Sequence, residues 1–125
     1  MRLRTIGLLA VVALAGCAKL HQQNSVSLDV GESHNIFISA PVSEQKLKVT
    51  MASDQPVNIW VVLEKDIPGG AKDFDPATLK SGIVASSKGA KEASLDATIP
   101  AKEAYRIFLN GANKKANVNV TIDGK

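Results

Sequence analysis

The sequence has few of the residues that most cofactor and nucleic-acid sites require. Its 125 residues include one cysteine, two histidines and only 4% aromatic residues. A single cysteine excludes an intramolecular disulfide framework and zinc or iron–sulfur sites of the CxxC type. So few aromatic side chains exclude a base-stacking platform for nucleic acid. The length allows one domain, and we expect it to bind no cofactor and no nucleic acid.

The sequence also lacks an apolar run long enough to span a membrane as a helix. The run at residues 6–15 has ten residues and follows Arg2 and Arg4, whereas a spanning helix needs roughly twenty. Two positive charges before a short apolar stretch are typical of a secretory signal peptide. We therefore expect residues 1–16 to be a signal peptide that is removed.

The end of this segment, Leu14-Ala15-Gly16-Cys17, resembles the lipobox of bacterial lipoproteins. In that family the thiol of the cysteine is joined to a diacylglyceryl group, and a dedicated signal peptidase cuts just before it. The resemblance implies a covalent acyl lipid such as palmitate on Cys17, with Leu14, Ala15 and Gly16 recognised by the peptidase. The alternative is a plain secretory signal, in which residues 13–15 fit the A-x-A pattern. It would leave an unpaired thiol in an oxidising compartment, which is a liability.

A lipid on Cys17 predicts a membrane-anchored lipoprotein of the bacterial cell envelope, on the periplasmic or extracellular face. Two or three acyl chains on one residue hold a protein on a bilayer far more firmly than one. Once residues 1–16 are removed, 13 basic residues stand against 12 acidic ones, so no cationic field attracts nucleic acid. We interpret residues 17–24 as the lipidated cysteine and a polar tether.

From residue 25 onward the dominant pattern is alternation of apolar and polar residues in short runs, which predicts β-strands. Turn residues separate the runs, and no long helical period occurs. The sequence predicts an all-β domain over residues 25–125, an antiparallel, jelly-roll-like β-sandwich of about eight strands. The expected strands are 25–30, 34–39, 46–51, 57–63, 82–87, 93–99, 104–109 and 117–123.

The order of these runs, with Pro100, Tyr105 and Asn110 as the most telling positions, loosely resembles the bacterial pre-peptidase C-terminal and GOLD-like β-sandwich group. Members of that group are non-catalytic modules used for secretion, adhesion or ligand contact. This chain differs because no peptidase is attached. The resemblance implies a fold more than a role.

Few residues are candidates for chemistry. His21 and His34 are the only histidines, and no GxSxG motif accompanies them, so we favour structural or incidental roles and expect no enzyme. Asp66, Asp73 and Asp75 could supply oxygen ligands for calcium, but the interspersed lysines favour a solvated loop. Trp60 could stack on a sugar ring, although packing under the 66–80 loop is the favoured interpretation.

The sequence thus predicts a non-catalytic structural or binding domain whose ligand it does not specify. The loops at 66–80 and 110–116 are the expected contact surfaces, because recognition commonly uses loops on a rigid scaffold. Two alternatives remain. One is a carbohydrate- or peptidoglycan-binding module, which needs exposed aromatic residues on one sheet face. The other is an accessory subunit that pairs with an envelope protein through an edge strand, with 25–30 or 117–123 as that edge.

Overall fold

The computed structural model describes residues 20–67, 76, 82–111 and 113–125, and these form an all-β domain. The elements are the strands β1 (Leu20–Leu28), β2 (Ser33–Ile38), β3 (Gln45–Leu63), β4 (Ile83–Ile99), β5 (Tyr105–Gly111) and β6 (Ala116–Gly124), with a short 3-10 helix, η2 (Glu64–Asp66), after β3. All strand pairs are antiparallel. Within the described ranges no helix has both the length and the apolar character needed to cross a bilayer.

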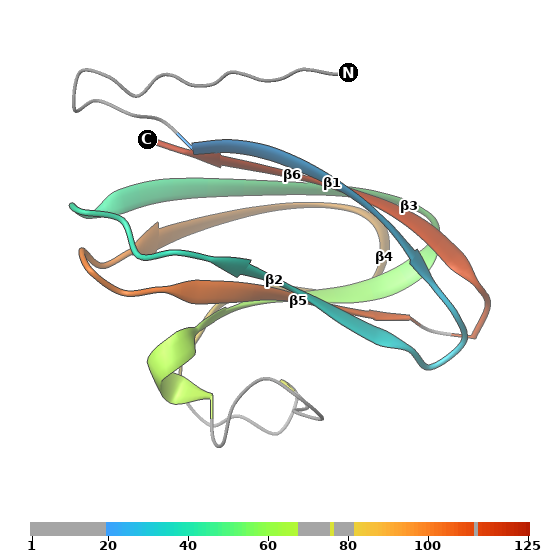
Figure 1. Ribbon diagram of the computed structural model, residues 1–125. Coiled ribbons are helices and arrows are strands. Elements are labelled where there is room, and N and C mark those ends of the chain that lie inside the picture. The colour runs from blue at the N-terminus through green and yellow to red at the C-terminus, as the bar shows by residue number, and fades with distance from the viewer. Residues whose placement is uncertain (1–19, 68–75, 77–81, 112) are drawn as a thin grey trace, which may run out of the picture.

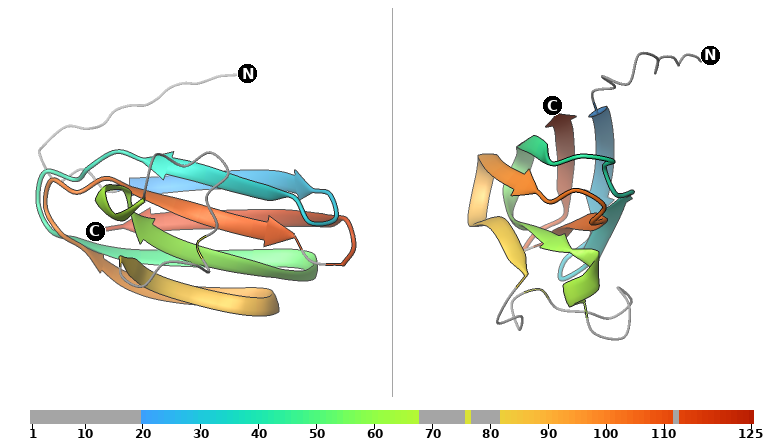
Figure 2. Two further views of the ribbon diagram at one scale, coloured as in Figure 1. Left: turned by 90° about the horizontal axis from the view of Figure 1, so that it is seen from below. Right: turned by 90° about the vertical axis from the view of Figure 1, so that its left-hand side faces the viewer.

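The strands belong to one sheet that folds over on itself into two facing layers (Figures 1 and 2). The order is β1-β6-β3-β5-β2, and β4 pairs with β3. The first half of β3 pairs with β6 through Leu47–Ser53, and its second half pairs with β5 through Val57–Leu63. β3 therefore belongs to both layers, and this nearly closed arrangement confirms the predicted antiparallel β-sandwich.

The two long strands change layers at a bend. In β3 the bend lies between Ala52 and Val57, where the register with β4 shifts, and Pro56 fits there because it cannot donate to a ladder. The hydroxyl of Ser53 donates to the carbonyl of Gln55 at 2.6 Å. The matching bend of β4 contains Gly89, whose φ of +63° favours glycine, and the Gly89 N–H donates to Asn58 Oδ1 at 2.8 Å.

These bends explain why the structure has six strands where about eight were predicted. The runs 46–51 and 57–63 lie in the two halves of β3, and the runs 82–87 and 93–99 belong to β4, apart from residue 82, which precedes it. The turn residues at 53–56 were interpreted as the end of one strand. In the structure they bend the chain while its pairing with β4 resumes beyond them.

The polar residues before position 25 are also strand, which corrects the predicted tether. Residues 20–24 form the first half of β1 and pair with the end of β6, from Leu20 opposite Gly124 to Asn24 opposite Val120. Only residues 17–19 of the predicted tether precede β1, and they lie outside the described residues. The pairing also corrects one predicted edge strand, because β6 lies between β1 and β3. β1, β2 and β4 each pair with a single strand.

The core lies between the two layers and is built from the inward positions of the alternating runs. Tyr105, the only tyrosine of the chain, is fully buried there, and its hydroxyl donates to Gln45 Oε1 at 3.2 Å. Burial raises the pKa of Tyr105 to about 12. The other large, fully buried side chains of this core are Leu28, Met51, Ile59, Ile99, Ile107, Leu109, Ile122, Val49, Val57 and Val61.

The bent strands give the sandwich two different ends. The terminal end holds the start of β1, the 39–44 and 100–104 loops and Lys125, so the described N-terminus and the C-terminus lie side by side there (Figure 1). The opposite end holds the turn at 29–32, the two bends and the 113–115 loop. We use these two names below.

Candidate functional site

The turns of the opposite end are fixed to one another by hydrogen bonds. In the 29–32 turn the Glu32 N–H donates to the Asp29 carbonyl at 2.9 Å, and the Glu32 carbonyl accepts from Gly111 N–H at 2.8 Å. Gly31 has a φ of +73°. A Cβ at Gly111 would come within 2.9 Å of the Asp29 carbonyl oxygen, so glycine allows the turn to sit against β5.

Asp54 fixes the bend of β3 to the start of β6. Its carboxylate accepts from the Asn117 N–H at 2.8 Å and from the Asn117 side-chain amide at 3.0 Å. The backbone hydrogen bond and then the side-chain hydrogen bond from Asn117 hold the pKa of Asp54 below its ordinary value. These hydrogen bonds therefore help to hold the bend of β3 and the start of β6 together.

This end presents exposed side chains on a rigid frame. Val30 is 64% exposed in its turn, and the other exposed side chains of this end include Lys88, Lys91, Lys114 and Lys115. A surface that is already ordered loses less conformational entropy on binding. The opposite end therefore has the properties of a binding surface, and it includes most of the predicted 110–116 contact loop.

Trp60 lies on the outer face of the layer that contains the second half of β3 and β5, where it is only 4% exposed. It packs with Val62, Ile67 and Phe108 in a small hydrophobic cluster. The indole therefore leaves little surface on which a sugar ring could stack. Tyr105 and Phe108 are buried as well. Among the described aromatic residues only Phe37 is exposed, at 50%.

Phe37 belongs to a polar cluster centred on Arg106. The Arg106 guanidinium lies 4.9 Å from the Phe37 ring centroid, and its Nε donates to Glu64 Oε2 at 2.6 Å. One terminal nitrogen donates to Asn35 Oδ1 at 2.6 Å. The guanidinium thus links η2, β5 and β2 on the outer face, which is a positioning role.

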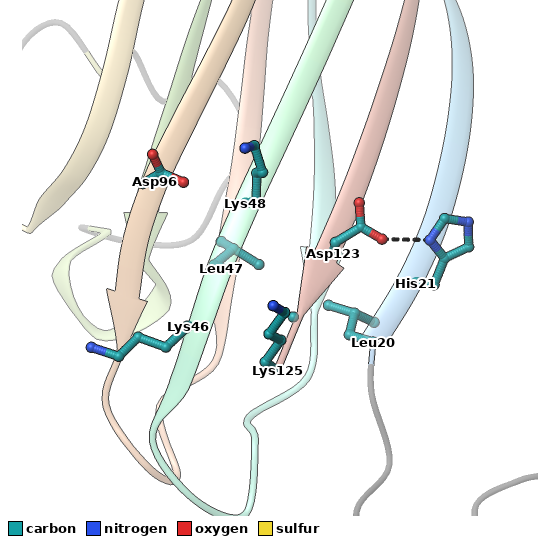
Figure 3. Close-up of a pocket in the computed structure, with 9 residues that line it drawn as sticks. Leu20, His21, Lys46, Leu47, Lys48, Asp96, Asp123 and Lys125 are labelled. Atoms are coloured by element: carbon teal, nitrogen blue, oxygen red, sulfur yellow. Dashed lines mark hydrogen bonds and ion pairs between the residues drawn. The ribbon is translucent and has the colours of Figure 1, made fainter.

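A groove of about 670 Å³ crosses the terminal end. Figure 3 shows its lining from β1, β3, β4 and β6, with Lys48 and Lys125 between Asp96 and the His21–Asp123 pair. His21 Nδ1 lies 2.5 Å from Asp123 Oδ1. Among the described residues that line this groove there is no serine, threonine or cysteine. His34 is exposed near the start of β2, next to the 29–32 turn of the opposite end. The two histidines therefore lie at different ends of the domain.

The predicted calcium ligands are only partly covered by the structure. The side chain of Asp66 packs against Gly82, where a Cβ would lie 2.4 Å from the Asp66 Cβ. Asp73 and Asp75 lie outside the described residues. Among the described residues, no group of three or more His, Cys, Asp or Glu side chains could hold a metal ion.

The lipobox residues Leu14, Ala15, Gly16 and Cys17 also lie outside the described residues, so lipidation of Cys17 stays a prediction. The sequence did not reveal the opposite end as one surface, because its parts are far apart in the chain. Hydrogen bonds between Asp54 and Asn117, and between Gly111 and Glu32, join them. Only glycine and proline at the turns gave a local signal.

Comparisons with known proteins add a likeness in fold. No protein-family model matches the sequence, and no characterised protein matches it in sequence. Among solved structures, the crystal structure of PliG from Aeromonas hydrophila, a periplasmic lysozyme inhibitor of g-type lysozyme, is similar with a TM-score of 0.61. The two sequences are 15% identical, and the match covers 91% of this chain and 93% of that chain. The two proteins therefore share an all-β fold over nearly their whole lengths.

Proposed function

We propose that this chain is a lipid-anchored, non-catalytic binding protein of the bacterial cell envelope, and that its ligand is a protein. The similarity in fold to a periplasmic lysozyme inhibitor is the observation that carries the proposal. The lipobox at residues 14–17 supports an envelope location and a lipid on Cys17. A lysozyme of the g type is the first partner to test, because the similar protein inhibits one.

The opposite end is the proposed contact surface. Its turns are ordered by hydrogen bonds, and Val30 projects from one of them with 64% of its surface exposed. An exposed apolar side chain on a rigid turn can fill a pocket of a partner at low entropic cost. This end carries four exposed lysines and four exposed carboxylates, those of Asp29, Glu32, Asp54 and Glu92, so charged groups of both signs can pair with a partner.

Titration of a g-type lysozyme with the purified protein, in detergent, tests this function. We expect stoichiometric binding by calorimetry and slower lysis of a cell-wall substrate. Val30→Arg should weaken binding, whereas Val42→Arg, at an exposed valine of the terminal end, should leave it unchanged. Equal loss in both variants would contradict the assigned surface.

A second measurement covers partners other than a lysozyme. Wild type and Cys17→Ser are each used as bait in a pull-down from detergent-solubilised envelope, and the captured proteins are compared. We expect a protein that wild type retains and that Val30→Arg does not retain. If wild type retained only polysaccharide, the protein-binding function would be wrong, and the carbohydrate-binding alternative would replace it.

A further inference from the structure

The terminal end stands closer to the predicted lipid anchor than the sequence indicated. β1 begins at Leu20, where pairing with Gly124 holds it in the sheet, so three residue steps separate it from Cys17. An extended chain covers at most ~3.3–3.6 Å per residue, so Leu20 stays within roughly 10 Å of the Cys17 backbone. This step depends on the lipidation proposed above.

The short distance between Cys17 and Leu20 limits what can contact the terminal end. Two packed β-sheets are already ~10 Å apart, so even a thin folded domain is thicker than this link is long. A folded partner therefore does not fit between the terminal end and the bilayer. The remaining occupant is the surface of the membrane itself. We infer that the terminal end is a membrane-contact surface, with Val42 at the lipid interface and lysines of the groove on anionic headgroups.

Val42 is the most exposed large hydrophobic residue among those described, at 88%. It lies in the 39–44 loop, on a second groove that also contains Leu20 and Lys125. The Lys102 N–H donates to the Pro41 carbonyl at 2.7 Å, which fixes this loop to the neighbouring one. An apolar side chain so close to the anchor can enter the boundary between headgroups and acyl chains.

Most charged groups of the terminal end surround the first groove, and Glu44 lies on the second groove with Val42. Lys46, Lys48 and Lys125 line it, together with the carboxylates of Asp96 and Asp123 (Figure 3). Asp123 is engaged by His21. Lysine side chains are long enough to place their ammonium groups at lipid phosphates while their stems stay on the protein.

The orientation has a consequence for the proposed function. Because the terminal end lies on the bilayer, the opposite end with Val30 points away from it, toward any partner in the compartment. The two exposed valines, Val30 and Val42, thus form a matched pair at the two ends of one domain. Neither is part of the core, so either can be replaced without opening a cavity.

Single-cysteine accessibility tests the orientation on the full lipidated protein. The bond to the diacylglyceryl group consumes the thiol of Cys17, the only native cysteine, so Val42→Cys and Val30→Cys each carry one free thiol. Each variant is bound to preformed vesicles of phosphatidylethanolamine and phosphatidylglycerol and reacted with a bulky, water-soluble maleimide. We expect Val42→Cys to react about tenfold more slowly, because its side chain lies within the ~5–10 Å interfacial layer, and both to react equally in detergent.

Charge reversal tests the lysines in the same assay. In the Val42→Cys background, Lys46→Glu with Lys48→Glu should speed the reaction on vesicles, whereas Lys88→Glu with Lys91→Glu, at the opposite end, should not. If neither double charge reversal changed the reaction rate of Val42→Cys on vesicles, the contact between the lysines and the headgroups would be overturned. Equal rates for the two single cysteines on protein that floats with the vesicles would overturn the membrane-contact surface.

The same flotation separates this inference from the proposed anchor. Protein that stays in solution, with an unmodified mass at its N-terminus, would refute lipidation and with it the contact surface. Protein that floats but shows two equally reactive cysteines would refute the contact surface alone.

Discussion

Raising the pH above 10 should destabilise the domain through Tyr105. This side chain is fully buried between the layers, and burial raises its pKa to about 12, whereas an unfolded tyrosine has a pKa of about 10. Between these values the unfolded state binds fewer protons than the folded state, so the free energy of unfolding falls as pH rises and levels off above the folded pKa. At ~1.4 kcal/mol per pKa unit the full loss is about 3 kcal/mol.

The assay combines an absorbance titration with urea unfolding. Because Tyr105 is the only tyrosine, tyrosinate absorbance reports this residue alone, and it should appear near pH 12 in the folded protein. Tyr105→Phe should cost about 1 kcal/mol at neutral pH, from the hydrogen bond to Gln45, but lose less stability between pH 10 and 12 than wild type. An ordinary titration near pH 10 in the folded protein would refute the closed core.

Three further predictions follow from individual contacts. Gly111→Ala should lower the free energy of unfolding by about 1–3 kcal/mol, because its Cβ would press on the Asp29 carbonyl; a denaturation midpoint equal to wild type would contradict that contact. The fluorescence of Trp60, the only tryptophan, should resist quenching by acrylamide, and quenching as rapid as in unfolded protein would argue against its burial. Asp54→Ala should destabilise the domain at neutral pH, and the difference should shrink as pH falls through the lowered pKa of Asp54. An equal difference at neutral and acidic pH would show that the ionised carboxylate is not what binds Asn117.

The sequence was sufficient to predict the fold class because the inward residues alternate. Leu47, Val49 and Met51 in one run, and Val118, Val120 and Ile122 in another, are all buried in the structure. Strand ends were less predictable. Pro56 and Gly89 are turn formers in either setting, and local sequence does not distinguish a turn that ends a strand from a bend within one.

The start of β1 escaped prediction for a different reason. Gln22 and Asn24 occupy inward positions of an edge strand, and the Gln22 side-chain amide donates to Asn24 Oδ1 at 2.9 Å, so two half-buried polar residues replace the apolar ones that the pattern requires. Pairing with β6, almost a hundred residues away in the chain, determines this strand. The shape of the candidate surfaces likewise depends on such distant pairings. The lipobox, by contrast, is a local motif of four residues, and lipidation of Cys17 stays a prediction.

Intact-mass spectrometry of the protein purified from its native membrane tests the central claim most directly. The account predicts a mature chain that begins at Cys17 and carries the added mass of a diacylglyceryl group and its acyl chains. A chain that begins at Gly16, or at Cys17 with an unmodified thiol, would contradict the lipid anchor and the orientation of the domain on the membrane.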